Sequence, residues 1–231
     1  MFSLIALLSL AVAPAALLIH QLAVPWYFVF WGAATWGVAV ALKRPLAAQL
    51  SRRLRNRGRL YVATAQGLLS AVLELGVAAL YLWRVKGADV YSIIGFGSGA
   101  GTAEICLVVV LSVREKDDSA REAEWLAKAR QSLCVRHQVA IERFFACVGH
   151  IGTRGLIYVG LNVGIPGGSI ILLAALAFFA FVDGVAMYGH LCGWDWFDPH
   201  RCRTVHLIFA SVSLLELTLF LVVFQLSHLG Q

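Results

Sequence analysis

Ionisable side chains inside long apolar stretches are the residues of this sequence best suited to chemistry. They are Glu74, Glu104, His150, Arg154 and Asp183. A charged side chain at mid-bilayer costs roughly 2.5–3.5 kcal/mol on insertion scales, so several of them require mutual pairing, protonation or a polar cavity. His150 and Arg154 are four residues apart and share one helix face. We expect these groups to form one internal site between the third and sixth predicted membrane spans.

A carboxylate beside an imidazole in a watery pocket is typical of hydrolytic chemistry. A buried glutamate can act as the base that activates water, and Glu74 and Glu104 are the candidates. His150 is expected to orient the water or to ligate zinc with the carboxylates, although a zinc site needs three protein ligands. Asp183 completes the candidate catalytic set. Arg154 is predicted to be the counter-ion of one acid or to stabilise the oxyanion.

The same residue types also have a plainer structural interpretation. An intramembrane glutamate is often a packing residue or an interhelical hydrogen-bond partner. We assign Glu216 to this class, because leucines surround it in the sequence. The glycine-rich stretch 95–101 is predicted to let another helix, or a substrate, approach closely.

Composition defines the elements that must position these groups. The chain has 231 residues, of which 60% are hydrophobic and 14% charged, and its mean hydropathy is +0.77. Soluble domains have about 45–50% apolar and about 25% charged residues. The sequence therefore predicts an all-α, polytopic transmembrane helix bundle that forms one domain over residues 1–231. Seven stretches have the length of about 20 residues that a span needs: 2–20, 25–42, 60–83, 90–113, 140–162, 168–190 and 205–227.

Lysine and arginine are distributed unevenly between the links. The links 43–59, 114–143 and 191–204 hold sixteen of these residues, and the alternate links hold two. Basic links usually face the cytoplasm, which predicts a cytoplasmic N-terminus in a prokaryotic inner membrane. A short amphipathic cytoplasmic helix is expected within the connector 114–138. The same asymmetry explains the net charge of +6 without nucleic acid, so the expected partners are the bilayer and a membrane-protein substrate or partner.

Two further groupings are rival candidate sites. Ser98 and His150 would form a serine dyad at the start of a glycine-rich helix. The segment after the sixth span contains candidate zinc ligands: His190, Cys192, Cys202 and His206. It would bind zinc if cytoplasmic, or form a disulfide between Cys192 and Cys202 if the topology is inverted. The plainer interpretation is a solvated interface loop anchored by tryptophans.

One stretch carries a resemblance to a known family. Residues 142–151 read Glu-Arg-Phe-Phe-Ala-Cys-Val-Gly-His-Ile, so a His stands eight residues after the Glu. With the order of the spans between residues 25 and 190, this resembles the YhfC-type family of intramembrane metalloproteases. The segments 67–74, 95–104 and 181–183 are similar to further segments of that family.

Several positions depart from the family's pattern. The family has two adjacent glutamates followed by Arg, whereas Leu75 follows Glu74 here. One family His falls near Ser98 or Ala100, and another falls on Phe179. The resemblance therefore implies an intramembrane protease-like protein that has lost polar positions and is a candidate for catalytic impairment. The alternative is a non-catalytic membrane protein that binds a small solute, a lipid or a partner protein through the same cluster.

Overall fold

The computed structural model describes residues 2–114 and 119–229, and within these ranges all regular secondary structure is helical. The helices are α1 (Phe2–Gln21), α2 (Trp26–Arg53), α3 (Arg59–Leu82), α4 (Val90–Arg114), α5 (Ser119–Gln131), α6 (Leu133–Arg136), α7 (Gln138–Asn162), α8 (Gly167–Leu191) and α9 (Pro199–Leu229). Each of the seven predicted spans falls on one of the long helices. The connector 114–138 contains α5 and α6, as expected of a helical connector.

Five of these helices are long and apolar enough to cross a membrane: α3, α4, α7, α8 and α9. The chain is thus a multi-pass membrane protein by length and composition, whereas the count of seven spans is not confirmed. Helix α2 is longer than the predicted span 25–42, because it continues through Lys43 and Pro45 to Arg53.

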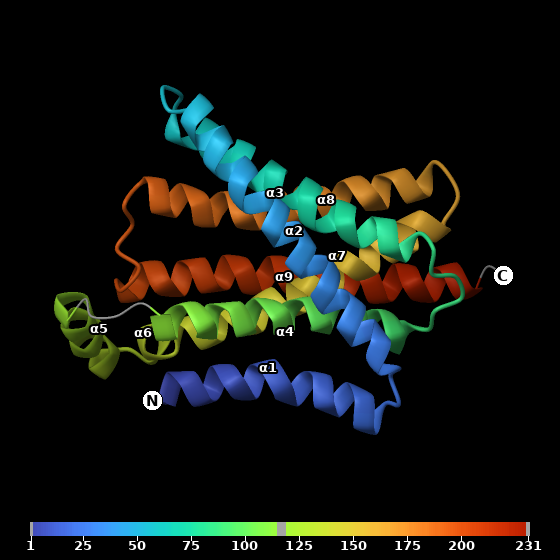
Figure 1. The fold of residues 1–231 in the computed structure, drawn as a ribbon, viewed down its shortest axis with the longest axis horizontal. Helices are drawn as coiled ribbons and strands as arrows, with labels where there is room; N and C mark the ends of the chain where they lie inside the picture. The colour runs from blue at the N-terminus through green and yellow to red at the C-terminus, as the bar shows by residue number, and fades with distance from the viewer. Residues whose placement is uncertain (1, 115–118, 230–231) are drawn as a thin grey trace.

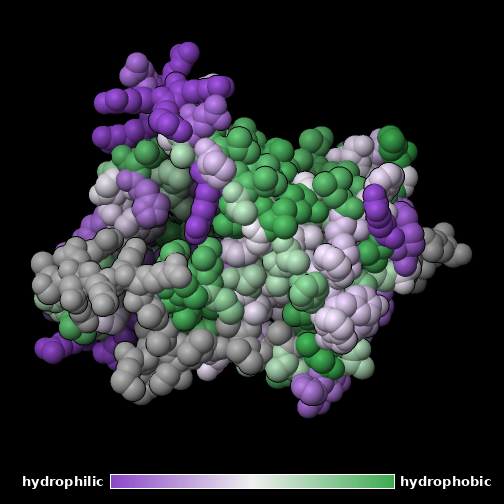
Figure 2. Space-filling model, in the orientation of Figure 1, coloured by the Kyte–Doolittle hydropathy of each residue, from purple (hydrophilic) through white to green (hydrophobic). Residues whose placement is uncertain are grey.

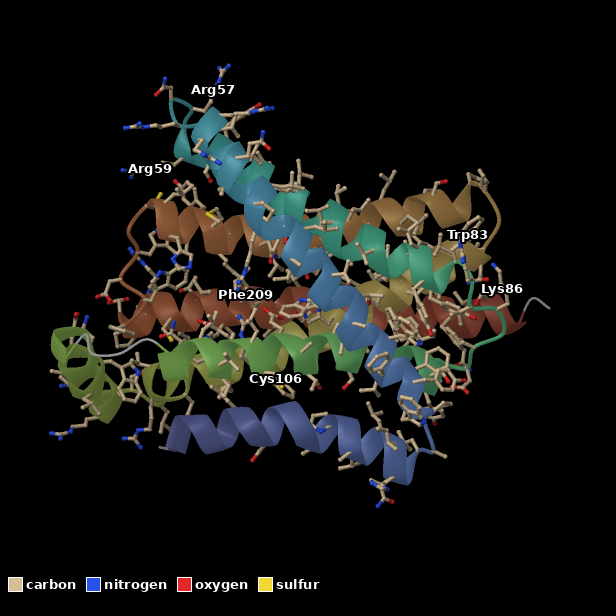
Figure 3. The ribbon with its side chains drawn as sticks, viewed as in Figure 1. Arg57, Arg59, Trp83, Lys86, Cys106 and Phe209 are labelled. Atoms are coloured by element: carbon tan, nitrogen blue, oxygen red, sulfur yellow. The ribbon has the colours of Figure 1, made fainter. Side chains whose placement is uncertain are left out.

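The long helices run side by side, with α2 crossing diagonally over the others (Figure 1). The link between α2 and α3, the helices α5 and α6, and the loop between α8 and α9 lie at the end of the bundle where the chain starts. The remaining connections lie at the opposite end, near the C-terminus. In Figure 3 Arg57 and Arg59 mark the first end, and Trp83 and Lys86 mark the second. The links rich in Lys and Arg therefore gather at one end.

The surface between these two ends is apolar. Figure 2 shows hydrophobic and near-neutral side chains across the middle of the visible face and hydrophilic side chains at the tip of the α2–α3 hairpin. On α8, the large side chains of Ile170, Leu173 and Phe181 are exposed. An apolar band of this kind is the surface that lipid tails cover in a membrane protein.

Glycines allow the long helices to pack closely. A Cβ added to Gly97 on α4 would collide with the backbone of Ile151 on α7. A Cβ on Gly152 would lie 2.6 Å from the backbone nitrogen of Leu217 on α9. Such distances are too short for any side chain, so only glycine permits these crossings. The glycine-rich stretch of α4 therefore serves helix packing, which was one of its two predicted uses.

Candidate functional site

A cavity of about 140 Å³ lies among α2, α3, α4, α7, α8 and α9. A water molecule takes up roughly 30 Å³ in the liquid, so the cavity has room for several waters. Its apolar lining includes Trp36, Phe179 and Phe209, the last of which is labelled in Figure 3. Its ionisable lining residues are Lys43, Glu74, Glu104, Glu142, Arg143, His150, Asp183 and Glu216.

One side of the cavity is organised around Lys43. Its Nζ donates to Glu74 Oε1 at 2.5 Å and to Ser70 Oγ at 2.9 Å. The Ser70 hydroxyl lies within hydrogen-bond distance of both Glu74 and Asp183, and Lys43 Nζ stands 3.8 Å from Asp183 Oδ2. These contacts join α2, α3 and α8. The ammonium group of Lys43 is thus the counter-ion of two carboxylates that face the same space. Buried carboxylates need such a partner, because an unpaired buried charge is strongly unfavourable.

The other side is organised around Glu104. Arg143 donates to one oxygen of its carboxylate, and His150 Nε2 lies 2.6 Å from the other. The second ring nitrogen, His150 Nδ1, lies 2.6 Å from Arg154 Nη1. Because a guanidinium only donates, Nδ1 is the acceptor in this contact. In the neutral imidazole the proton therefore sits on Nε2, which donates to Glu104.

Arg154 lies behind this group and is fully buried. Its Nε and Nη2 have no hydrogen-bond partner among the described residues, and neither does the buried Glu216 Oε1. Buried polar atoms of this kind are where an ordered water is expected. Arg154 was predicted to pair with an acid, but its direct hydrogen bond is to His150. The i, i+4 spacing that places both residues on one face of α7 brings their side chains into contact.

The structure brings the predicted site residues together. Glu74, Glu104, His150 and Asp183 all line the one cavity, as the convergence hypothesis requires. Glu216, which the sequence assigned to packing, also lines this cavity from α9. The site also extends beyond the third to sixth spans, since α2 and α9 contribute to it.

Sequence reasoning missed three ionisable members of the site. Lys43 was assigned to a basic link, because nothing local shows that α2 crosses over Glu74. Glu142 and Arg143 were noted only as part of a motif. Both residues stand about three helical turns before Arg154 on α7, at 12 and 11 residues. Assigning the residues of this helix to its faces would have pointed to them.

Both rival groupings require correction. Ser98 is fully buried, and its hydroxyl has no hydrogen-bond partner within the described part of the chain. Both nitrogens of His150 are engaged by Glu104 and Arg154, so a dyad with Ser98 is not formed. Cys192 and Cys202 are free thiols, so they form no disulfide.

A zinc site in the cavity has little geometric support, because the single histidine has no free nitrogen. Among the side chains that the structure describes, one group of three or more potential ligand atoms is close enough to hold a metal, and it lies outside the cavity lining. It consists of Cys134, Cys202 and His206. Two of these three were in the predicted set, whereas Cys134, on a different helix, was missed.

The chain was compared with known families, curated proteins and solved structures. No protein-family model, no curated protein and no solved structure matches the chain. The resemblance to the YhfC-type family therefore stays a hypothesis based on sequence.

Proposed function

We propose that the chain is a membrane-embedded, peptidase-like protein whose site is the cavity among α2, α3, α4, α7, α8 and α9. The observation that carries this proposal is that Glu74, Glu104, His150 and Asp183, from four separate helices, line one cavity large enough for water. Peptide hydrolysis inside a membrane needs such a pocket, together with a base and a stabiliser for the oxyanion.

Glu74 is the base in this proposal. Its Oε1 accepts from Lys43 and Ser70, and Oε2 accepts no hydrogen bond from any described residue. Glu74 removes a proton from water as the water oxygen bonds to the scissile carbonyl carbon. It then delivers that proton to the leaving amide nitrogen as the C–N bond breaks. Lys43 and Arg143 are the cations that line the cavity and can stabilise the oxyanion.

Glu104 and His150 act as positioning residues in this scheme. Both oxygens of Glu104 and both nitrogens of His150 already have partners. His150 therefore has no free nitrogen for a metal in this arrangement. Glu74, unlike Glu104, has a carboxylate oxygen without a hydrogen-bond partner among the described residues.

A second candidate function is the binding of a small cationic solute. Five carboxyl groups line the cavity against two cationic side chains, so its lining is rich in acceptors. A cation with hydrogen-bond donors would complement that excess. This candidate is favoured by that excess of carboxyl groups in the lining.

Cleavage of single-span membrane peptides by the purified protein in liposomes tests the two candidates. For the peptidase, Glu74→Gln lowers kcat by about 100-fold or more, because a general base contributes 10²–10⁴-fold. The exposed Glu124→Gln is the matched control and leaves the rate unchanged. Absence of cleavage by the wild type contradicts the peptidase. A rise in melting temperature on adding a small organic cation, abolished by Asp183→Asn, would then support the binder.

We also propose that the end of the bundle carrying the basic links faces the cytoplasm of a prokaryotic cell, with seven spans and the N-terminus inside. The support is that the links with sixteen of the Lys and Arg residues lie at one end. Reporter fusions within 43–59 should report a cytoplasmic location. An external signal from these fusions contradicts the orientation.

A further inference from the structure

A second polar cluster lies outside the cavity, where α6 meets the start of α9. Cys134 is on α6, whereas Cys202 and His206 are one helical turn apart on α9. Cys134 Sγ lies 3.0 Å from Cys202 Sγ and 3.0 Å from His206 Nδ1, and Cys202 Sγ lies 3.8 Å from the same nitrogen. Cys202 and His206 are buried, and Cys134 is partly buried. Three soft donor atoms from two elements therefore point at one another.

We propose that Cys134, Cys202 and His206 form a Zn²⁺ site. Thiolate sulfur and imidazole nitrogen are the ligands that zinc prefers, and sets of two Cys and one His leave a fourth position open for water. Donor atoms on a tetrahedral zinc, with bonds of about 2.3 Å to sulfur and about 2.0 Å to nitrogen, stand roughly 3.5–3.8 Å apart. The observed separations of 3.0–3.8 Å are close to this range. A small outward movement of Cys134 would accommodate the ion.

The surroundings of His206 fit a metal ligand. Its Nδ1 faces the two thiols, and its buried Nε2 has no hydrogen-bond partner within the described ranges. The carboxylate oxygen Glu142 Oε1 lies 3.6 Å from that Nε2. A carboxylate behind a metal-bound histidine fixes the ring orientation and raises its basicity. Glu142 is placed to do this once Nε2 carries the proton.

An apolar shell covers the cluster. Ala129 and Val135 are buried against Cys202, with Trp125 and Phe197 packed on them. The indole Nε1 of Trp125 donates to the carbonyl of Val135 at 3.2 Å, which ties α5 to α6 over the site. Such a shell limits water access and strengthens binding of the charged ion by the thiolates. Zinc here would fasten the α5–α6 connector to α9, and this inference does not depend on the peptidase proposal.

Zinc content of the full-length protein tests the proposal. The protein is purified in detergent under reducing conditions, stripped with a chelator, reloaded with Zn²⁺ and dialysed before metal analysis. We expect about one zinc per chain, and a raised melting temperature on reloading. Co²⁺ in place of Zn²⁺ should give thiolate-to-metal charge-transfer absorption. Cys134→Ser, Cys202→Ser and His206→Ala should each lose these signals.

Two cysteine variants are matched controls. Cys192→Ser removes a thiol at the same end of the bundle, and Cys106→Ser removes an exposed thiol from α4, labelled in Figure 3. Both should bind zinc like the wild type. Glu142→Gln should weaken zinc binding by about 10-fold or more, as loss of an outer carboxylate partner typically does.

Four results would overturn the site. The first is a reduced wild-type protein that retains no zinc. The second is uptake of Cu(I) with no uptake of Zn²⁺, since thiolates also favour that ion. The third is a Cys134–Cys202 disulfide in anaerobically purified protein, together with no zinc uptake after reduction. Loss of zinc from Cys192→Ser to the same degree as from Cys202→Ser would equally contradict the assignment.

Discussion

Replacing Glu104 with glutamine removes the charge that joins α4 to α7. The carboxylate accepts from Arg143 on one oxygen and lies 2.6 Å from His150 Nε2 on the other. A glutamine of the same shape keeps one acceptor oxygen and turns a pair of N–H donors toward the second partner. One of the two donors on α7 then loses its acceptor, and the Arg143 guanidinium loses its counter-charge.

The cost of this change follows from the burial of the pair. Removing one partner of a buried ion pair typically costs about 3–5 kcal/mol. The side chains of Glu104 and Arg143 retain 23% and 19% of their exposure, so solvent screens part of this interaction. We therefore expect a loss of about 2–3 kcal/mol. For a chain of this length that corresponds to a fall in melting temperature of roughly 4–12 °C.

Thermal unfolding of the purified protein in detergent measures the effect. Glu124→Gln is the control, because Glu124 accepts from Lys128 at 2.9 Å on the exposed surface, and its melting temperature should not change. A double-mutant cycle with Arg143→Met should show that the two substitutions are not additive. An unchanged melting temperature for Glu104→Gln would refute the reasoning that this ion pair is buried and formed.

Two further predictions concern packing and a surface ion pair. Gly152→Val should lower the melting temperature sharply, because its side chain would meet the α9 backbone, whereas Gly76→Ala, with open space around it, should be tolerated. Lys128 Nζ donates to Asp195 Oδ2 at 2.7 Å and holds the pKa of Asp195 below its usual value. The contribution of this pair is therefore present at neutral pH and lost as the pH falls through that lowered pKa. Carboxyl NMR should show the pKa of Asp195 rising in Lys128→Gln, and an unmoved pKa would contradict the contact.

The sequence was informative where an ionisable residue stands in an apolar stretch, because burying its charge in a membrane is unfavourable in free energy. Charged groups in apolar stretches are expensive unless they converge, so Glu74, Glu104, His150 and Asp183 could be placed together before the fold was known. The helix positions followed from apolar length alone. The apolar length of a span is a local property of the sequence. The convergence of charged groups is a requirement on the whole bundle, because a charged side chain is costly in contact with lipid.

Long-range contacts were out of reach of that reasoning. Lys43 and Glu74 are separated by 31 residues, and only the crossing of α2 over α3 brings them together. Cys134 and Cys202 are 68 residues apart and meet because the connector folds back onto α9. Glu216 was assigned to packing because its neighbours in the sequence are leucines, although its cavity partners come from other helices.

Accessibility of Asp183 to water tests the central claim, that ionisable side chains from separate membrane helices share a hydrated cavity. Asp183 lines the cavity on α8, whereas Phe181, two residues earlier, is exposed on the apolar surface. Each residue is replaced by cysteine, and the variants in liposomes are treated with a water-soluble thiol reagent. Intact-mass measurement then gives the number of modified cysteines, which is compared with that of the wild type. The account predicts modification of Asp183→Cys and none of Phe181→Cys. An unreactive Asp183→Cys in a folded protein would contradict it.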